Sequence, residues 1–364
     1  MATHLAAVSI AKGEPLRLQT RPTPKPGKGE LLIEVKSVAF NPADRIMRDQ
    51  GLFIASYPTV VGIDISGLVL DVGDDVSVGG PGEGPSPFFR PGITRVAAYA
   101  ASIWKSCHPD YGAFQERCLV PWQHAVPLPE EGISWNQAAT LPVAAQVPLN
   151  AWDVMGIPRV GKAIPLASLT ATRSSTGNGR GTQNNKRDKG EALLIWGASS
   201  SVGTMGVQSA RVLREDHSSS FAAVYATASA ANHKYVISLG ADRVFDYKEP
   251  QVVDAIVSAA REDGLVIRHC FLANGKLALC QAVLQASVRD NEGRGNCKAQ
   301  IASAPVITPD VEEVNGVETI FVLPSTDESE RLAQFQYWMG TWLRENLAKG
   351  AVRPSPEPRV VGKA

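Results

Sequence analysis

The sequence has no excess of charge of either sign, no long apolar run and no signal-like N-terminus. Lys plus Arg and Asp plus Glu number 36 each, so the formal net charge is zero. No overall field therefore attracts nucleic acid or an anionic membrane surface. No apolar run approaches the ~20 residues that a membrane span needs, and the first residues lack a basic region followed by an apolar stretch. We expect a cytoplasmic protein that binds neither nucleic acid nor membrane.

Cysteine pairing is also missing. The spacing of the five cysteines fits neither a zinc ribbon nor a disulfide framework, and no Cys-x-x-Cys pair occurs. The cysteines are Cys107, Cys118, Cys270, Cys280 and Cys297. We expect these cysteines to be reduced thiols that are buried or have no chemical role. His108 follows Cys107 directly, but adjacent side chains seldom face one metal ion, so this pair predicts no metal site.

The composition is that of an ordinary globular protein, and the chain is long enough for two domains. The chain has 364 residues, of which 44% are hydrophobic and 20% charged. Gly and Pro make 78–92 a loop. Residues 168–190 are rich in Ser, Thr, Asn, Gly and basic residues, which predicts a disordered surface loop. This loop could also be a basic nucleic-acid arm, but it lacks the interleaved aromatic residues of such arms.

The predicted secondary structure differs on the two sides of this loop. Before it, short runs that alternate or are punctuated by Gly and Pro predict strands, at 31–38, 63–72, 95–100 and 114–120. Ser134 is a good N-cap for a short helix at 136–140, and Pro142 and Pro148 should break or kink the chain beyond this helix.

After the loop, strands at 192–196, 222–226 and 243–245 alternate with helices, one from about Val202 and another at 231–239. Alternation of this kind predicts βαβ units and a parallel sheet. The sequence therefore predicts an α/β protein with a β-rich domain followed by a parallel-sheet domain.

A buried strand that runs into a Gly/Ser turn and a helix is the central motif. A dinucleotide fingerprint needs glycine for the tight turn, for approach to the pyrophosphate and for helix–strand packing. Gly197 fills the first position and Gly203 the third, while Ser200 occupies the second. Hydroxyls of Ser199, Ser200 and Ser201 can donate to phosphate oxygens, and the helix start near Val202 favours an anion. The alternative is a plain Gly-rich turn without a ligand.

The end of the second strand bears on the choice of dinucleotide. An NAD site places an acidic residue there to bind the ribose hydroxyl, and its charge would repel the 2′-phosphate of NADP. Residues 227–234 contain no acid, whereas Ser229, Asn232 and His233 are polar and Lys234 is a cation. The sequence therefore favours NADP(H) as cofactor.

Several motifs occur together in a fixed order between residues 30 and 250. They are NPAD (41–44), GIDISGLVLDVG (62–73), FRPGITRVAAY (89–99), YGAFQERCLV (111–120), AATLPVA (138–144), GASSSVG (197–203) and LGADRVFDY (239–247). With them the chain resembles the medium-chain dehydrogenase/reductase superfamily in its zinc-free quinone-reductase branch, in particular the trans-acting enoyl reductases of fungal polyketide synthesis.

The resemblance implies a GroES-like catalytic domain at 1–155, a Rossmann-like cofactor domain at 156–340 and a return toward the catalytic domain at 341–364. This return is expected to be shorter than in relatives, which continue for a few dozen residues. The resemblance also implies cofactor contacts from four places. These are Ala43 and Asp44, the turn Ser199 to Val202, Ser229 with Asn232, and Tyr247.

Zinc enzymes of this superfamily bind their catalytic metal through a Cys in the first motif and a Gly-His-Glu element. Here the second element reads Gly62-Ile63-Asp64, and one carboxylate cannot replace three protein ligands, so no metal is predicted. The implied reaction is hydride delivery from NADPH to an activated C=C bond or a quinone. Asn41 and Tyr111 are candidate proton donors by location only. A lysine found two positions after the motif's Asp in some relatives is Ile46 here.

Three functions stay open at this stage. The first is an enoyl reductase of fungal secondary metabolism, with a small-molecule or carrier-bound acyl substrate and a polyketide synthase as partner. The second is a quinone or enone reductase of general metabolism. The third is a non-catalytic paralogue that binds NADP(H) without completing an active site.

Overall fold

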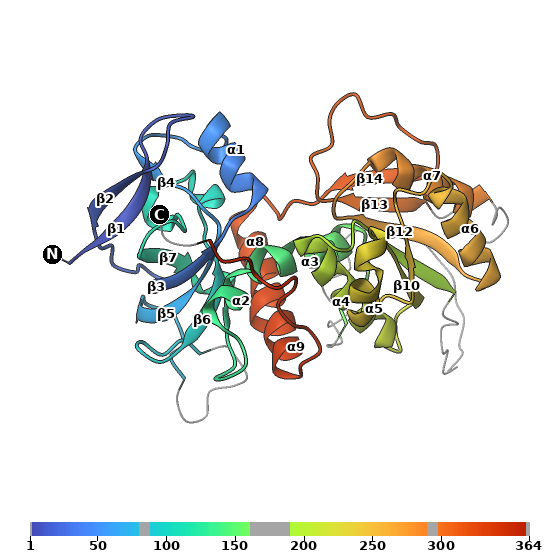
Figure 1. Ribbon diagram of the computed structural model, residues 1–364. Helices are drawn as coiled ribbons and strands as arrows, with labels where there is room; N and C mark the ends of the chain where they lie inside the picture. Colours follow the sequence, from blue (N-terminus) through green and yellow to red (C-terminus); the bar gives the residue numbers. More distant parts are fainter. Residues whose placement is uncertain (1, 80–87, 161–189, 290–297, 362–364) are drawn as a thin grey trace, which may run out of the picture. The chain divides into compact units, whose positions relative to one another are not determined.

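The computed structural model describes residues 2–79, 88–160, 190–289 and 298–361 (Figure 1). The chain forms two compact units, one of Met1–Val147 with Leu323–Ala364 and one of Pro148–Val322. The sequence placed the changes of domain later, after 155 and after 340. The loop predicted at 168–190 lies outside the described residues, apart from Gly190. No helix in the described part of the chain is both long and apolar enough to span a membrane.

The first unit contains two antiparallel sheets. A three-stranded sheet has the order β2-β1-β4, with β1 (Thr3–Ser9), β2 (Arg17–Pro22) and β4 (Thr59–Val60). A five-stranded sheet has the order β7-β3-β5-β6-β8, with β3 (Glu30–Ala39), β5 (Asp64–Val72), β6 (Arg95–Tyr99), β7 (Arg117–Pro121) and β8 (Ala125–Pro127). These sheets confirm the predicted β-rich domain and its first three strands.

The fourth predicted strand, at 114–120, begins later than the sequence indicated. Residues before Arg117 bond to the neighbouring sheet instead, since Ala7 N–H donates to the Phe114 carbonyl at 2.8 Å and Glu116 N–H to the Leu5 carbonyl at 3.0 Å. The segment thus ties β1 to the start of β7, and tertiary pairing overrides the local strand pattern.

Close approach of β3 and β5 explains the glycine inside the second predicted strand. A Cβ on Gly67 would lie 2.1 Å from the Glu34 carbonyl oxygen and 2.7 Å from an Ile33 methyl group. In the same sheet, Asp64 lies opposite Tyr99 across β5 and β6. Directly opposed residues of an antiparallel pair project from one face, so this register places the two side chains together.

Helices of the first unit begin at capping residues. α1 (Pro42–Gln50) has Asn41 at its N-cap and Pro42 at its first position. α2 (Trp135–Ala139) has the predicted cap, because Ser134 Oγ accepts the Gln137 N–H at 3.2 Å and Gln137 accepts the Ser134 N–H at 3.0 Å.

Helix α2 ends just before Pro142, where the sequence predicts a break, and the two prolines have different places in the helix that follows. Pro142 is the first residue of α3 (Pro142–Val154), where proline lacks no hydrogen bond that a helix needs. Pro148 lies inside the helix, which continues through it. Downstream of Pro148 the helix is anchored by Trp152, whose Nε1–H donates to Ser209 Oγ at 3.1 Å and whose ring packs edge-on against Phe271. This packing offsets the one hydrogen bond that Pro148 cannot make.

The C-terminal residues return to the first unit as three consecutive helical segments. They are α8 (Glu328–Phe335), the π-helical η6 (Gln336–Leu343) and α9 (Arg344–Ala348). α8 contacts the short η3 (Trp122–His124), and η6 contacts both η3 and β8. Phe335 stacks on His124 with ring centroids 3.9 Å apart and an interplanar angle of 24°.

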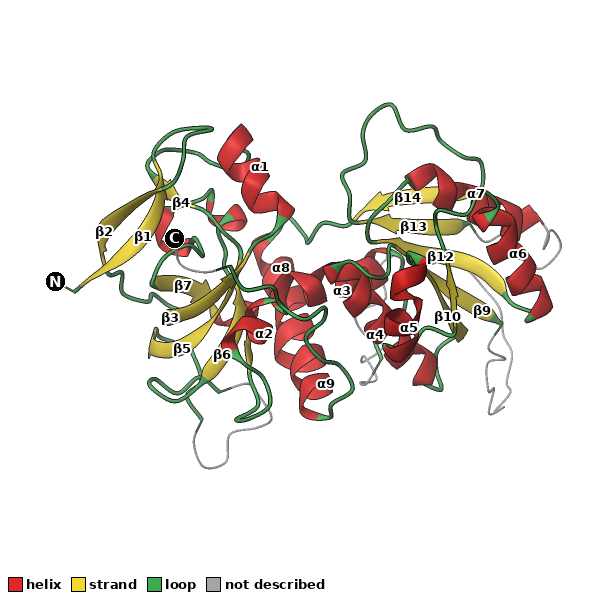
Figure 2. Ribbon diagram, viewed as in Figure 1, coloured by secondary structure: helices red, strands yellow, loops and turns green. Residues whose placement is uncertain are grey.

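The second unit is a six-stranded parallel sheet of order β11-β10-β9-β12-β13-β14 with helices on both faces (Figure 2). Its strands are β9 (Glu191–Trp196), β10 (Phe221–Thr227), β11 (Arg243–Phe245), β12 (Val266–Leu272), β13 (Ala299–Ser303) and β14 (Val317–Phe321). Its further helices are α4 (Ser201–Glu215), η5 (Ala230–Asn232), α5 (His233–Ser238), α6 (Val252–Glu262) and α7 (Leu277–Arg289). The predicted α/β parallel-sheet domain is confirmed.

Alternate residues of the central strand serve the two faces of this sheet. Leu194 and Trp196 belong to the core cluster that includes residues of α6 and α7. Ile195 faces the other way, where Gly206 of α4 lies so close that a Cβ would meet the Phe271 ring at 2.9 Å and Ile195 at 3.4 Å. A strand buried on both faces accounts for the continuous apolar run in the sequence.

Candidate functional site

The turn after β9 requires glycine at its first position. Gly197 has φ +79°, and a Cβ there would lie 2.4 Å from the Asn274 carbonyl oxygen and 2.9 Å from its nitrogen. The segment after β12 therefore packs directly on the turn, which only a residue without a side chain permits. This is the tight-turn role that the fingerprint assigned to Gly197.

Glycine is also required at position 203, in the first turn of α4. A Cβ on it would lie 2.3 Å from the Gly197 carbonyl oxygen and 2.9 Å from the Ala198 Cα. The start of α4 thus rests against the backbone of the turn that leads into it. This is the close helix–strand packing expected of the third glycine of the fingerprint.

Ser200, at the second position, serves the helix itself. Its hydroxyl accepts the Gly203 N–H at 3.1 Å and donates to the Gly197 carbonyl at 2.8 Å. Ser200 is therefore the N-cap of α4. The hydroxyl thus already donates one hydrogen bond and accepts another inside the turn. Ser200 Oγ could donate to a phosphate only if its bond to the Gly197 carbonyl opened.

Backbone N–H groups at the turn provide better donors. Within the described residues, the N–H groups of Ser199, Ser201 and Val202 have no acceptor, and Ser201 is exposed. α4 is 15 residues long, so the positive end of its dipole is added to these unpaired donors. Donors and dipole together fit the diphosphate of a dinucleotide.

The loop after β10 is tied to this turn. Thr227 Oγ1 accepts the Gly197 N–H at 3.0 Å, and the Ala198 N–H donates to the Thr227 carbonyl at 2.9 Å. Two of the predicted cofactor residues meet just beyond, where Asn232 Nδ2 donates to Ser229 Oγ at 3.1 Å. The structure thus brings the phosphate turn and the expected ribose-binding loop to the same end of the parallel sheet.

An acidic residue that the sequence reasoning missed lies at this loop. Asp246, directly after β11, accepts the Ala230 N–H at 3.0 Å and the Lys248 N–H at 2.9 Å. The hydrogen bond from the Lys248 backbone and that from Ala230, with charges of Lys248 and His233 nearby, lower the pKa of Asp246. A carboxylate therefore comes to the loop from the next strand, although residues 227–234 contain none.

Two further predicted contacts of the cofactor, Lys234 and Tyr247, are on the surface of the same unit. Lys234 is exposed in the first turn of α5, and Tyr247 is 42% exposed directly after Asp246. Both side chains are free to reach a ligand at the loop. Ala43 and Asp44 belong to the other unit, so their contact with the cofactor stays a prediction.

A second cluster of polar groups lies in the first unit, around Asn41. The Asn41 N–H donates to Asp44 Oδ2 at 2.7 Å, and its side-chain Nδ2 donates to Asp64 Oδ2 at 3.1 Å. Asp64 Oδ1 accepts the Val143 N–H, in the first turn of α3, at 3.0 Å. One asparagine thus connects two carboxyl groups. They are only 5% and 2% exposed, for Asp44 and Asp64 respectively.

Burial dominates the electrostatics of this cluster. It raises the pKa of Asp44 to about 7, against the opposing hydrogen bond from Asn41. It also raises the pKa of Asp64, to which the nearby Asp44 adds, while the bonds from Asn41 and Val143 oppose the shift. The pKa of Tyr99, which shares a face with Asp64, is raised by its burial and then by both carboxylates. Sequence reasoning gave Asn41 and Asp44 as candidate site residues, considered Asp64 only as a metal ligand, and assigned no role to Tyr99.

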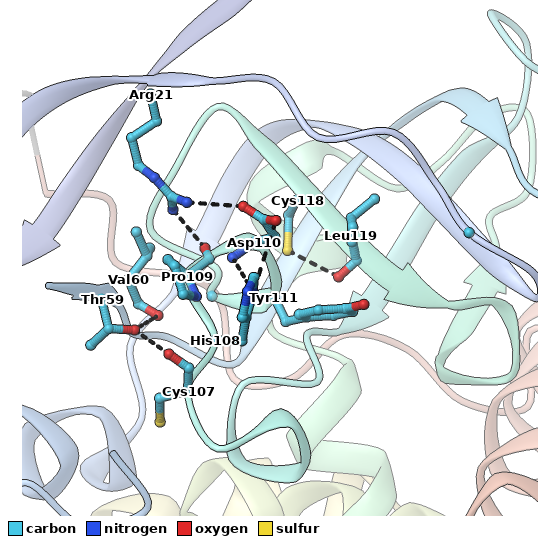
Figure 3. Close-up of polar contacts among 12 residues, drawn as sticks. Arg21, Thr59, Val60, Cys107, His108, Pro109, Asp110, Tyr111, Cys118 and Leu119 are labelled. Atoms are coloured by element: carbon cyan, nitrogen blue, oxygen red, sulfur yellow. Dashed lines mark hydrogen bonds and ion pairs between the residues drawn. The ribbon is translucent and has the colours of Figure 1, made fainter. Parts of the chain in front are cut away.

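Tyr111, the other candidate proton donor, has a structural partner. Its hydroxyl donates to Glu30 Oε1 at 2.5 Å, and its burial followed by this bond raises its pKa. In Figure 3 its ring points away from Arg21, which donates to Asp110 and to the Pro109 carbonyl at 2.9 Å each. These contacts hold the 109–111 turn to β2 and β3, which accounts for Tyr111 without a catalytic role.

The four cysteines that the structure describes form neither a disulfide nor a metal site. Four thiols are free and buried, namely Cys107, Cys118, Cys270 and Cys280, whereas Cys297 lies outside the described residues. Burial is the first cause that raises the pKa of three of them, Cys107, Cys118 and Cys280. Across the described ranges, no group of three or more His, Cys, Asp or Glu residues is arranged to hold a metal ion.

Known proteins match part of the first unit as a domain and nearly the whole chain by sequence. Residues 27–130 match the alcohol dehydrogenase GroES-like domain. A trans-enoyl reductase of Aspergillus flavipes is 36% identical over 361 residues, which cover 98% of this chain and 91% of that protein. A trans-enoyl reductase of Aspergillus terreus is 37% identical over 333 residues, covering 91% of this chain and 95% of that protein.

The fold is shared more widely than the sequence. An alcohol dehydrogenase superfamily protein from Novosphingobium aromaticivorans superposes with a TM-score of 0.67 over 98% of this chain and 90% of its own, at 19% identity. At that identity the likeness concerns the fold alone.

Proposed function

The chain belongs to the medium-chain dehydrogenase/reductase superfamily, in the group of the fungal trans-enoyl reductases, and from this premise we propose that it transfers a hydride from NADPH to an activated C=C bond. It is an oxidoreductase of this superfamily, whose parallel-sheet unit implies a nicotinamide cofactor. The substrate is an α,β-unsaturated acyl group, either free or carrier-bound, in fungal secondary metabolism.

The start of α4 carries this proposal. The N–H groups of Ser199, Ser201 and Val202, which have no acceptor in the described part of the chain, lie at a turn whose close packing requires Gly197 and Gly203. Such a cradle binds a diphosphate through the backbone, so it accepts a dinucleotide without a cationic side chain. When bound, the dihydronicotinamide supplies the hydride, and the protein orients the substrate and stabilises the charge that develops on it.

Preference for NADPH over NADH rests on the loop after β10. Lys234 is a nearby exposed cation, which favours the extra phosphate. The carboxylate of Asp246 is committed to the loop, because its two oxygens accept the backbone N–H groups of Ala230 and Lys248. We therefore assign Asp246 to holding the loop and Lys234 to the 2′-phosphate.

Titration of the purified chain with NADPH and NADH tests the cofactor assignment. We expect tighter binding of NADPH, a loss of that preference in Lys234→Ala, and unchanged affinity for NADH in that variant. Lys248→Ala is the matched control, since its contact with Asp246 uses the backbone N–H that alanine keeps. Equal affinity of the wild type for both dinucleotides would refute the NADPH assignment, and absence of binding would refute the enzymatic proposal.

Substrate profiling tests the reaction. We expect NADPH oxidation with α,β-unsaturated acyl thioesters, faster when the acyl group is on a carrier protein domain of a polyketide synthase than on a small thiol. Turnover only with quinones would replace the enoyl assignment by a general quinone reductase. NADPH binding without turnover on either class would identify a non-catalytic paralogue.

A further inference from the structure

The chain passes from one unit to the other at Val147–Pro148 and returns at Val322–Leu323. A proline stands at both crossings, since Pro148 is the first residue of the second unit and Pro324 the second residue of the returning segment. The first crossing lies inside a continuous helix, because α3 runs through Pro148 without interruption. One helix therefore belongs to both units.

The two halves of α3 are bonded to different units. In its first turn, the Val143 N–H donates to Asp64 Oδ1 at 3.0 Å, and Asp64 belongs to β5 of the first unit. Near its end, Trp152 Nε1–H donates to Ser209 Oγ of α4 at 3.1 Å, and the Trp152 ring lies edge-on to Phe271 of β12 with centroids 5.7 Å apart. Each half is thus fixed to its own unit, so a rotation between the units must bend α3 between these anchors.

Pro148 is the weakest point of α3 between the anchors. It has no N–H, so the Ala144 carbonyl lacks its donor within the helix, and the proline ring crowds the same carbonyl. Asn150 adds a second weakness, because it is 0% exposed and neither Oδ1 nor Nδ2 has a partner among the described residues. Buried amide groups without partners are costly. Helices bend where their hydrogen bonding is interrupted, so α3 is softest here.

The second crossing is a short joint between two fixed points. The Val322 N–H donates to the Ser303 carbonyl of β13 at 2.9 Å, which holds Val322 to the second unit. Ser325 is held to α8 of the first unit through its N–H, its hydroxyl and its carbonyl. Between them, Leu323 and Pro324 make no hydrogen bond within the described chain, and Leu323 is 44% exposed. Only two residues therefore link one anchored point to the next.

We propose that Pro148 and the joint Leu323–Pro324 form a two-point hinge, about which the unit Pro148–Val322 rotates against the rest of the chain. A few residues of this kind absorb the backbone rotation of a domain motion, while the anchors keep the interior of each unit unchanged. The hinge does not depend on the enzymatic function proposed above. With that function, its rotation controls the exchange of the dinucleotide, a step that often limits kcat.

Pro148→Ala is the discriminating variant, because alanine restores the N–H for the Ala144 carbonyl and removes the ring that crowds it. We expect the midpoint of thermal unfolding to rise by roughly 5 °C. The same bond stiffens the hinge, so the variant should be more stable and at the same time less able to rotate. If the proposed reaction occurs, its kcat should be several-fold lower.

Pro142→Ala is the matched control in the same helix. Pro142 is the first residue of α3, where an N–H has no partner within the helix, so alanine gains no bond there. Its midpoint of thermal unfolding, its rotation and its kcat should equal those of the wild type.

Pulsed electron paramagnetic resonance measures the rotation without turnover. Nitroxide labels are attached to Leu18→Cys in the first unit and Val306→Cys in the second, which are 78% and 70% exposed, in a Cys297→Ser background. The four other cysteines are buried and escape labelling. We expect a broad distribution of label–label distances in the wild type and in Pro142→Ala, and a clearly narrower one in Pro148→Ala.

A narrow distribution in the wild type would overturn the hinge without any variant. A distribution as broad in Pro148→Ala as in the wild type would overturn the role of Pro148, even if the variant were more stable. Narrowing in Pro142→Ala as well would show that α3 is not softened at Pro148. A wild type that rotates but binds no dinucleotide refutes the proposed function and leaves the hinge standing.

Discussion

Gly203→Ala is the sharpest perturbation of the phosphate-binding turn, because it adds one methyl group where the backbone has no room. The new Cβ would lie 2.3 Å from the Gly197 carbonyl oxygen, 2.9 Å from the Ala198 Cα and 2.8 Å from Ser200 Oγ. Two of these atoms belong to the backbone and cannot rotate away. The first turn of α4 must therefore move away from the turn that precedes it.

The size of the effect depends on the contacts that this displacement breaks. Overpacking of this kind costs about 1–3 kcal/mol of folding free energy. It also moves the N–H groups of Ser201 and Val202 from their positions toward the diphosphate. A hydrogen bond to a charged group contributes about 1.5–3 kcal/mol, so misalignment of one such bond lowers dinucleotide affinity roughly tenfold to a hundredfold.

Fluorescence titration with NADPH measures the affinity, and urea unfolding measures the stability of the same sample. Gly264→Ala is the control, since Gly264 has φ +69° and nothing within 4 Å of an added Cβ. Its left-handed backbone makes alanine cost about 1 kcal/mol of stability without touching the turn. We expect this control to bind NADPH as the wild type does. If Gly203→Ala also bound NADPH with wild-type affinity, the diphosphate would not rest against the start of α4.

Three other substitutions probe the first unit. Burial lowers the pKa of His124 to about 3, below its unfolded value of about 6.5, so the fold favours the neutral ring. The stability that the neutral His124 ring contributes is complete above pH 6.5. As the pH falls from there toward 3, urea unfolding should show a loss of about 1.4 kcal/mol of stability per pH unit. His124→Asn should remove this slope, and an unchanged slope would contradict the lowered pKa of His124. Tyr111→Phe should cost about 1–2 kcal/mol through the lost bond to Glu30 and leave kcat unchanged, whereas a large fall in kcat would restore Tyr111 as a proton donor. Gly67→Ala should cost about 3 kcal/mol or more in thermal or urea unfolding, because its Cβ would meet the Glu34 carbonyl at 2.1 Å; wild-type stability would show that β3 and β5 can separate.

Local signals made the phosphate turn and several elements predictable. A strand buried on both faces leaves a continuous apolar run, and the Gly/Ser turn then indicates α4, which begins at Ser201, one residue before the expected start. The capping box of Ser134 and Gln137 is equally local, since both partners lie within one turn of helix. In each case the interacting residues are near neighbours in the sequence, so the local sequence pattern is enough to predict the local structure.

Features set by pairing between distant segments could not be read in this way. The opposition of Asp64 and Tyr99 depends on the register of β5 and β6. Asp246 reaches the loop after β10 from a different strand. Pro148 stays within α3 because distant residues such as Phe271 hold the helix in place. The phosphate turn was thus visible in the sequence, whereas the pairing of Asp64 with Tyr99 became visible only when the register of the sheet was known.

The hydrogen bonds of Ser200 to Gly197 and Gly203 explain why serine occupies the second position of the fingerprint. Ser200 uses its hydroxyl for the Gly203 N–H and the Gly197 carbonyl, and it thereby fixes the first turn of α4. A glycine there would be nearly as good an N-cap, at a cost of only a few tenths of a kcal/mol, but it would leave the Gly203 N–H without this acceptor. With the side chain committed, the backbone donors at Ser199, Ser201 and Val202 remain for the diphosphate. Affinity must then depend on the geometry of the backbone more than on any hydroxyl, which is why a methyl group at Gly203 should harm binding more than removal of the Ser199 or Ser201 side chain.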